Sequence, residues 1–181
     1  MIFISAGHNT KGLKTDPGAI GNGFKEADLT VEIRDLVIAE LKRLKIPYIS
    51  DNDDERLGTY LERIKAGNGS VVLEFHFDAS ANTSATGTTA LIEAEADRLD
   101  RAFAKELSDA TANILGIINR GVKTEAESHR GRLALMREEG IICLLEVCFI
   151  SNSQDVALYK ANKEKLAMQI AQILIKYEKM I

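Results

Sequence analysis

Short apolar runs alternate with amphipathic stretches along this chain, and the alternation constrains its fold more than any other feature. Strand-like runs cover residues 2–5, 46–49, 71–75, 88–92 and 141–149, with weaker candidates at 121–123 and 133–136. Helical periodicity covers residues 26–44, 58–65, 97–115 and about 154–177. Strands separated by helices predict an α/β sandwich with a mostly parallel central sheet flanked by helices.

Size and composition indicate one globular domain over residues 1–181. Apolar residues make up 45% of the chain and charged residues 28%, which disfavours disorder and membrane insertion. The net charge is −4, and no cluster of lysine and arginine with interleaved aromatic residues occurs, so we predict no nucleic-acid partner. The sequence does not indicate an oligomeric state.

The N-terminus lacks the basic segment and the long apolar run of a signal peptide. We therefore expect either cytoplasmic synthesis with release by lysis, or a domain excised from an exported protein. Cys143 and Cys148 lie five residues apart in one predicted strand, on opposite faces and roughly 16 Å from each other. They are expected to be free, buried thiols rather than a disulfide.

Glu146 lies inside the most apolar run of the chain, residues 141–149. Removing a lone carboxylate from water favours its protonated form, which suits a group that shuttles protons near neutral pH. Two other interpretations remain open. The residue could face solvent from an edge strand, or it could pair with an arginine such as Arg132.

Two of the three histidines, His8 and His76, directly follow predicted strands. Sites in open α/β sheets form beyond the carboxyl ends of the strands, so both histidines and Glu146 are expected at one rim. Glu26 opens the first helix, where an acidic residue also complements the helix dipole. Two imidazoles and a carboxylate form a ligand set for catalytic zinc. The glycines of residues 18–23 match neither a P-loop nor a dinucleotide fingerprint, and are expected to form turns.

Four blocks of sequence together resemble the zinc-dependent N-acetylmuramoyl-L-alanine amidases, of the phage endolysin or bacterial autolysin type. The blocks are Ser5-Ala-Gly-His8, Asp16-Pro-Gly-Ala-Ile-Gly21 leading to Glu26, Glu74-Phe-His-Phe-Asp-Ala79, and Leu145-Glu-Val-Cys-Phe-Ile-Ser-Asn152. The resemblance covers essentially the whole chain. It implies a catalytic domain that cuts the amide between N-acetylmuramic acid and L-alanine in peptidoglycan. The chain departs from the family at Asn9-Thr10, where a glycine is common, and at Phe77-Asp78, where a small residue and asparagine are frequent.

The resemblance also implies roles for individual residues. His8, Glu26 and His76 would hold one zinc ion per chain. Glu146 would take a proton from the attacking water and pass it to the departing alanine nitrogen.

Three further residues are candidates for substrate binding: Asp78, His129 and Arg130. Asp78 could instead cap the loop that follows it. His129 could instead be a solvent-exposed side chain, and Arg130 part of a solvated charged face together with Arg132.

Other functions remain open at this stage. The chain could be a zinc-dependent hydrolase of another amide, such as a peptidase of the stem peptide. It could also be a non-catalytic wall-binding domain, although a purely structural site has no need of a buried acid such as Glu146. A cysteine hydrolase using Cys148 is disfavoured because no electropositive setting for a thiolate is visible.

Overall fold

A computed structural model describes residues 1–9, 11, 15–64, 70–128 and 132–181. Its centre is a six-stranded sheet with the order β4-β1-β5-β8-β6-β7. The strands are β1 (Ile2–Ala6), β4 (Tyr48–Ser50), β5 (Val71–Asp78), β6 (Thr88–Ile92), β7 (Asn119–Thr124) and β8 (Ile141–Phe149). Strands β4, β1, β5 and β8 are mutually parallel, and β6 and β7 run together in the opposite direction. The predicted α/β fold with a mostly parallel sheet is confirmed.

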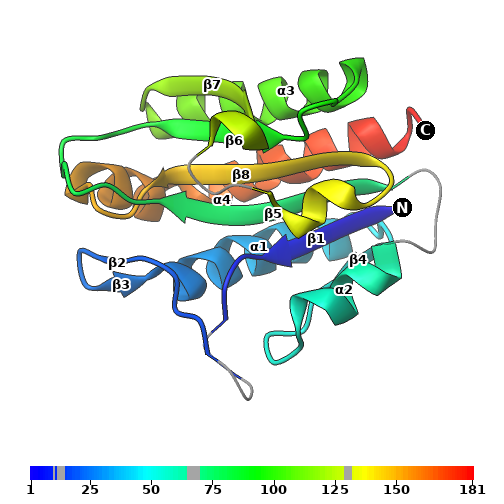
Figure 1. The fold of residues 1–181 in the computed structure, drawn as a ribbon, viewed down its shortest axis with the longest axis horizontal. Coiled ribbons are helices and arrows are strands. Elements are labelled where there is room, and N and C mark those ends of the chain that lie inside the picture. The colour runs from blue at the N-terminus through cyan, green and yellow to red at the C-terminus, as the bar shows by residue number, and fades with distance from the viewer. Residues whose placement is uncertain (10, 12–14, 65–69, 129–131) are drawn as a thin grey trace.

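Helices cover both faces of this sheet (Figure 1). Helices α1 (Glu26–Arg43), α3 (Arg98–Leu115) and α4 (Ser153–Glu178) pack over the larger core. Helix α2 (Leu57–Ile64) and the 3₁₀ helix η2 (Ala134–Arg137) cover a smaller core on the other face. The remaining elements are a short hairpin, β2 (Ile20–Gly21) and β3 (Phe24–Lys25), and the 3₁₀ helix η1 (Glu125–Glu127). Within the described ranges, no helix combines the length and the apolar character needed to cross a bilayer.

Side chains alternate between the two cores along β5 and β8. Leu73 and Leu145 belong to the core under α1, α3 and α4, whereas Val72 and Leu144 belong to the core under α2. Because successive strand residues point to opposite faces, the even-numbered Glu74, His76 and Glu146 lie on the α2 side of the sheet. A single face therefore carries Glu74, His76 and Glu146.

Most predicted elements occur where the periodicity placed them, with three corrections. Strand β5 extends to Asp78, so His76 lies inside it rather than after it. The strand predicted at 46–49 is displaced to Tyr48–Ser50, because the Ile46 amide closes the end of α1 on Leu41 and Pro47 has no N–H to donate. The strand predicted at 133–136 was wrong. That segment is η2, and an apolar run of four residues does not by its pattern distinguish a strand from a helical turn.

Both cysteines are free and buried, as predicted, but their expected placement on opposite faces was wrong. Cys143 and Cys148 belong to the same core cluster. The register between β5 and β8 shifts after Glu146: His76 pairs with Glu146, whereas Asp78 pairs with Phe149. Strand β8 thus carries one extra residue at this point, and such a bulge breaks the two-residue alternation.

Candidate metal centre

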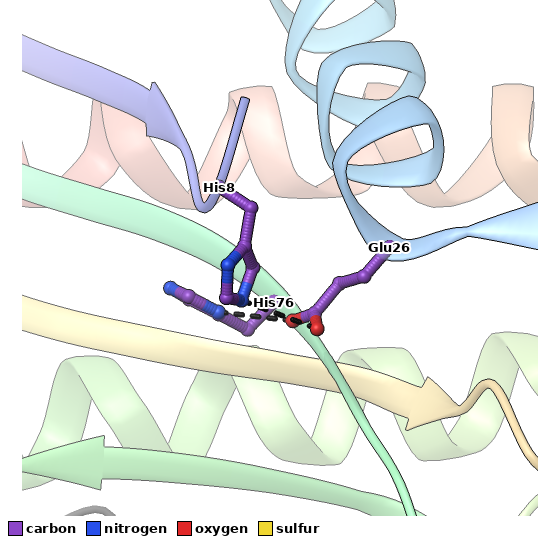
Figure 2. A group of neighbouring side chains, drawn as sticks. All are labelled: His8, Glu26 and His76. Atoms are coloured by element: carbon purple, nitrogen blue, oxygen red, sulfur yellow. Dashed lines mark hydrogen bonds and ion pairs between the residues drawn. The ribbon is translucent and has the colours of Figure 1, made fainter. Parts of the chain in front are cut away.

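Three side chains converge at the carboxyl-terminal rim of the sheet (Figure 2). His8 follows the end of β1, His76 projects from the neighbouring strand β5, and Glu26 is the first residue of α1. Parallel neighbouring strands bring the two histidines to the same rim. The hairpin and the turn before α1 return the chain to this rim, so that Glu26 meets both rings.

Glu26 bridges the two imidazoles. Its Oε1 lies 3.0 Å from Nδ1 of His76, and its Oε2 lies 3.2 Å from Nε2 of His8. The rings meet edge to face with their centroids 5.0 Å apart. Backbone amides of Phe77 and Ala19 also donate to the carboxylate, at 3.0 and 2.9 Å. One ligand atom from each of the three residues lies within 4.8 Å of the others, an arrangement that could hold a metal ion.

The backbone around these residues is shaped to let the rings approach. A Cβ on Gly7 would lie 2.2 Å from the His76 ring, and a Cβ on Gly18 would lie 2.6 Å from Glu26 Oε2. His8 itself has a φ of 64°, a left-handed backbone conformation that residues other than glycine rarely adopt. Residues held in such conformations cluster at functional sites, where the surrounding structure maintains them.

The charges of the three residues depend on one another. Burial opposes ionisation of Glu26, but hydrogen bonds from His76 and His8 outweigh it and hold the pKa of that carboxyl far below its usual range. Burial alone would lower the pKa of His76, yet Glu26 and Glu74 raise it to about 9. The pKa of His8 is also raised, because Glu26 and Asp16 outweigh its burial. The carboxylate and the two rings thus favour one another's charged forms.

Glu146 lies beside this group. It is the register partner of His76 on the adjacent strand β8, and only 3% of its surface is exposed. Strand β8 is internal to the sheet, with β5 on one side and β6 on the other, so the edge-strand interpretation was wrong. Arg132, the arginine considered as its partner, has an exposed side chain.

The rim opens into a cavity of about 280 Å³. His8 and His76 contribute to its lining, and so do Tyr60 of α2 and Leu135 of η2. A concave site with a few convergent polar groups beside apolar walls is typical of a substrate pocket.

Comparison with known proteins assigns the chain to a family. Its residues 2–176 match the family model described as N-acetylmuramoyl-L-alanine amidase. The chain belongs to the N-acetylmuramoyl-L-alanine amidase family. The resemblance inferred from the four sequence blocks is confirmed.

Relatives and solved structures agree with this assignment to the amidase family. The N-acetylmuramoyl-L-alanine amidase LytC of Bacillus subtilis is 26% identical over 97% of this chain, which spans only 35% of LytC. A Neisseria meningitidis structure described as an N-acetylmuramoyl-L-alanine amidase has a TM-score of 0.80, at 29% identity over 97% of this chain and 93% of that one. The catalytic domain of CwlV from Bacillus (Paenibacillus) polymyxa has the same fold, with a TM-score of 0.80 at 23% identity and 99% and 98% coverage.

The remaining predicted residues of this amidase-family chain have different outcomes. Asp78 accepts a hydrogen bond from the Ala79 amide at 2.8 Å, the loop-capping arrangement considered for it. Its role in substrate binding stays a prediction. His129 and Arg130 lie outside the described residues. Burial raises the pKa of the Cys148 thiol well above its usual value, which agrees with the weak case for a cysteine hydrolase.

Sequence reasoning missed two carboxylates that contact the histidines. Glu74 Oε1 lies 3.0 Å from Nε2 of His76, and Asp16 Oδ2 lies 2.9 Å from Nδ1 of His8. A signal for Glu74 was present: it is the one charge in the apolar run 71–75 and lies two residues before a histidine. Residues two apart on a strand share a face, so this spacing predicts contact.

Proposed function

We propose that this chain is a zinc-dependent N-acetylmuramoyl-L-alanine amidase domain spanning residues 1–181 and acting on peptidoglycan of the cell wall. One observation carries the proposal: His8, Glu26 and His76 present ligand atoms within 4.8 Å of one another, with Glu146 in register beside His76. Two imidazoles and a carboxylate suit a catalytic zinc site, which keeps a further position open for water. Membership of the N-acetylmuramoyl-L-alanine amidase family indicates which bond is cut, the amide between N-acetylmuramic acid and L-alanine.

Zinc bound by these three residues would polarise the scissile carbonyl and lower the pKa of a water molecule toward about 7. The protein's own contribution is proton transfer. Glu146 projects from β8 on the same face as His76, so it can accept a proton from the attacking water. The same carboxyl then returns the proton to the alanine nitrogen, because an amide nitrogen leaves poorly without protonation.

The cavity provides the route for the substrate. Its lining includes His8, His76, Tyr60 and Leu135. A stem peptide lying in this cavity would bring its first amide to the rim where Glu146 lies. Asp78, His129 and Arg130 remain proposed contacts to the substrate.

The test is digestion of purified peptidoglycan by the zinc-loaded protein, followed by mass analysis of the fragments. The proposal expects each new amine to belong to L-alanine, with loss of products on chelation and recovery on adding zinc. His76→Ala is the matched control, and it should release no fragments. New amines on another residue would make the protein a stem-peptide peptidase. Binding to peptidoglycan without any cleavage would make it a wall-binding domain.

A further inference from the structure

In the group formed by His8, Glu26 and His76, each of the two histidines contacts two carboxylates, one on either side of the ring. Glu26 lies on the convergent side of both rings, next to His8 Nε2 and His76 Nδ1. On the outer side, Glu74 lies 3.0 Å from His76 Nε2 and Asp16 lies 2.9 Å from His8 Nδ1. A histidine that binds a metal through one nitrogen commonly donates its other N–H to a carboxylate.

We infer that Glu74 is a positioning residue for metal binding. It accepts the Nε2–H of His76 and thereby presents Nδ1 to the metal. This inference rests on the proposed zinc site and adds to it a residue outside the ligand set.

The backbone fixes Glu74 in this place. Glu74 and His76 alternate onto the same face of β5, and Ser5 is the register partner of Glu74 on β1. The Ser5 hydroxyl donates to Glu74 Oε2 at 3.1 Å, which leaves Oε1 directed at the imidazole. Both oxygens of the carboxylate thus have a partner, and the ring has a single orientation that satisfies Glu74 and Glu26 together.

Burial makes the Glu74 contact stronger than the equivalent contact of Asp16. The side chains of Glu74 and His76 are 9% and 8% exposed, whereas Asp16 is 64% exposed. Apolar residues of the α2-side core, including Val72 and Leu144, flank Glu74 on its own and the adjacent strand. Charge interactions are weakly screened in such surroundings and strongly screened at the surface. The two outer carboxylates therefore form a matched pair that differs mainly in exposure.

The first test is zinc affinity, measured by competition with a chromogenic chelator for the wild type, Glu74→Gln and Asp16→Asn. Glutamine keeps the shape and one acceptor oxygen but removes the charge. Glu74→Gln should weaken zinc binding roughly 10–100-fold, the usual effect of losing an outer partner of a ligand histidine. Asp16→Asn should weaken it only a few-fold. Equal effects in the two variants, or a Glu74→Gln affinity within about threefold of the wild type, would overturn the inference.

The second test reads the ring directly and does not depend on a variant that folds. The chain has three histidines, so two-bond ¹H–¹⁵N correlation spectra of the zinc-loaded wild type can be assigned. The inference expects His76 to carry its proton on Nε2. A proton on Nδ1 would overturn it. If the wild type binds no zinc at all, the proposed function fails, whereas normal zinc binding with an unaffected Glu74→Gln variant refutes only the role of Glu74.

Discussion

At the scale of single residues, the close packing of His8, Glu26 and His76 depends on neighbouring glycines as well as on the three side chains themselves. Gly7 lies against the His76 ring with no room for a Cβ. This contact limits how closely the His76 imidazole can pack against the backbone at Gly7. The position of the His76 ring therefore depends partly on a residue that has no side chain.

Gly7→Ala should push the His76 ring out of place. We expect at least tenfold weaker zinc binding and a loss of about 1–3 kcal/mol of unfolding free energy, the usual cost of overpacking. Zinc titration and urea unfolding measure the two effects. Gly58→Ala in α2 is the control, because a Cβ there meets nothing within 4 Å. It should leave zinc affinity unchanged and stabilise the protein by roughly 0.5–1 kcal/mol. Unchanged zinc binding in Gly7→Ala would contradict the packing argument.

Glu146→Gln should separate proton transfer from metal binding. The side chain keeps its shape but can no longer accept the proton of water, so hydrolysis of peptidoglycan should fall roughly 10²–10⁴-fold. Zinc content should stay at one ion per chain and thermal stability should change little. Elemental analysis and calorimetry check both. Near-normal hydrolysis would remove Glu146 from the mechanism, and loss of zinc would make it a ligand instead.

Residue types and their order predicted that His8, Glu26 and His76 meet, but not what surrounds them. Each of these two histidines follows a predicted strand, Glu26 begins a helix, and all three are metal-binding residue types. The partners Glu74 and Asp16 were not predicted, because identifying them requires strand length, register and side-chain orientation. The spacing of Glu74 and His76 predicts their contact only if one strand contains both, and the predicted strand ended at residue 75.

At the scale of elements, one carboxylate joins helices α1 and α4. Glu32 of α1 accepts hydrogen bonds from Tyr159 at 3.0 Å, Lys160 at 2.8 Å and Lys163 at 2.6 Å, all on α4. Burial opposes its ionisation, but the two lysines and the tyrosine lower the pKa of Glu32 below its ordinary value. The ionised carboxylate thus stabilises the packing of α1, whose first residue is Glu26, against α4.

Glu32→Gln should cost roughly 1 kcal/mol at pH 7, since the contacts are charge-assisted but partly exposed to water. A lowered folded-state pKa gives stability that is present above the unfolded value of about 4.3 and lost as pH falls through the folded value. The difference from wild type should therefore shrink as the pH falls below about 4.3. Urea unfolding at a series of pH values measures it. Glu40→Gln, which removes an exposed pair with Arg43 on the same helix, should change stability by less than about 0.5 kcal/mol. A Glu32 effect that does not shrink at all with falling pH would refute the ionic explanation.

Periodicity was a good guide to long elements and a poor one to short ones. The pattern of Leu29, Ile33, Val37 and Leu41, all buried, located α1 to within a residue. The two-residue strands of the hairpin at Ile20–Lys25 are too short to leave a pattern. The bulge after Glu146 follows from strand pairing, which one strand's sequence does not contain.

At the scale of the whole molecule, the apolar cores are separate from the group formed by His8, Glu26 and His76. Apolar clusters fill both faces of the sheet, and they include none of these three residues. The fold should therefore persist without zinc. A ligand that binds only the native state adds stability in proportion to the logarithm of its concentration.

Chelation should leave the far-ultraviolet circular dichroism spectrum unchanged. Zinc at about 100 times its dissociation constant should add roughly 2.7 kcal/mol, which raises Tm by roughly 5–10 °C for a chain of this size. Scanning calorimetry with and without zinc measures the shift. The His76→Ala variant should show none. Collapse of the circular dichroism signal on chelation would mean that the metal supports the fold itself.

The pairing of strands far apart in sequence also bears on the order of steps in folding. Glu26 and His76 are 50 residues apart in sequence, and Ser5 and Glu74 are 69 apart. Loops of this length must close before β1, β5 and α1 meet, and such non-local pairing is the slow part of folding. His8, Glu26 and His76 should accordingly meet only after the central strands have docked. The rate of zinc uptake during refolding should thus report how fast the sheet is completed. Zinc present from the start of refolding should not speed the assembly of the sheet.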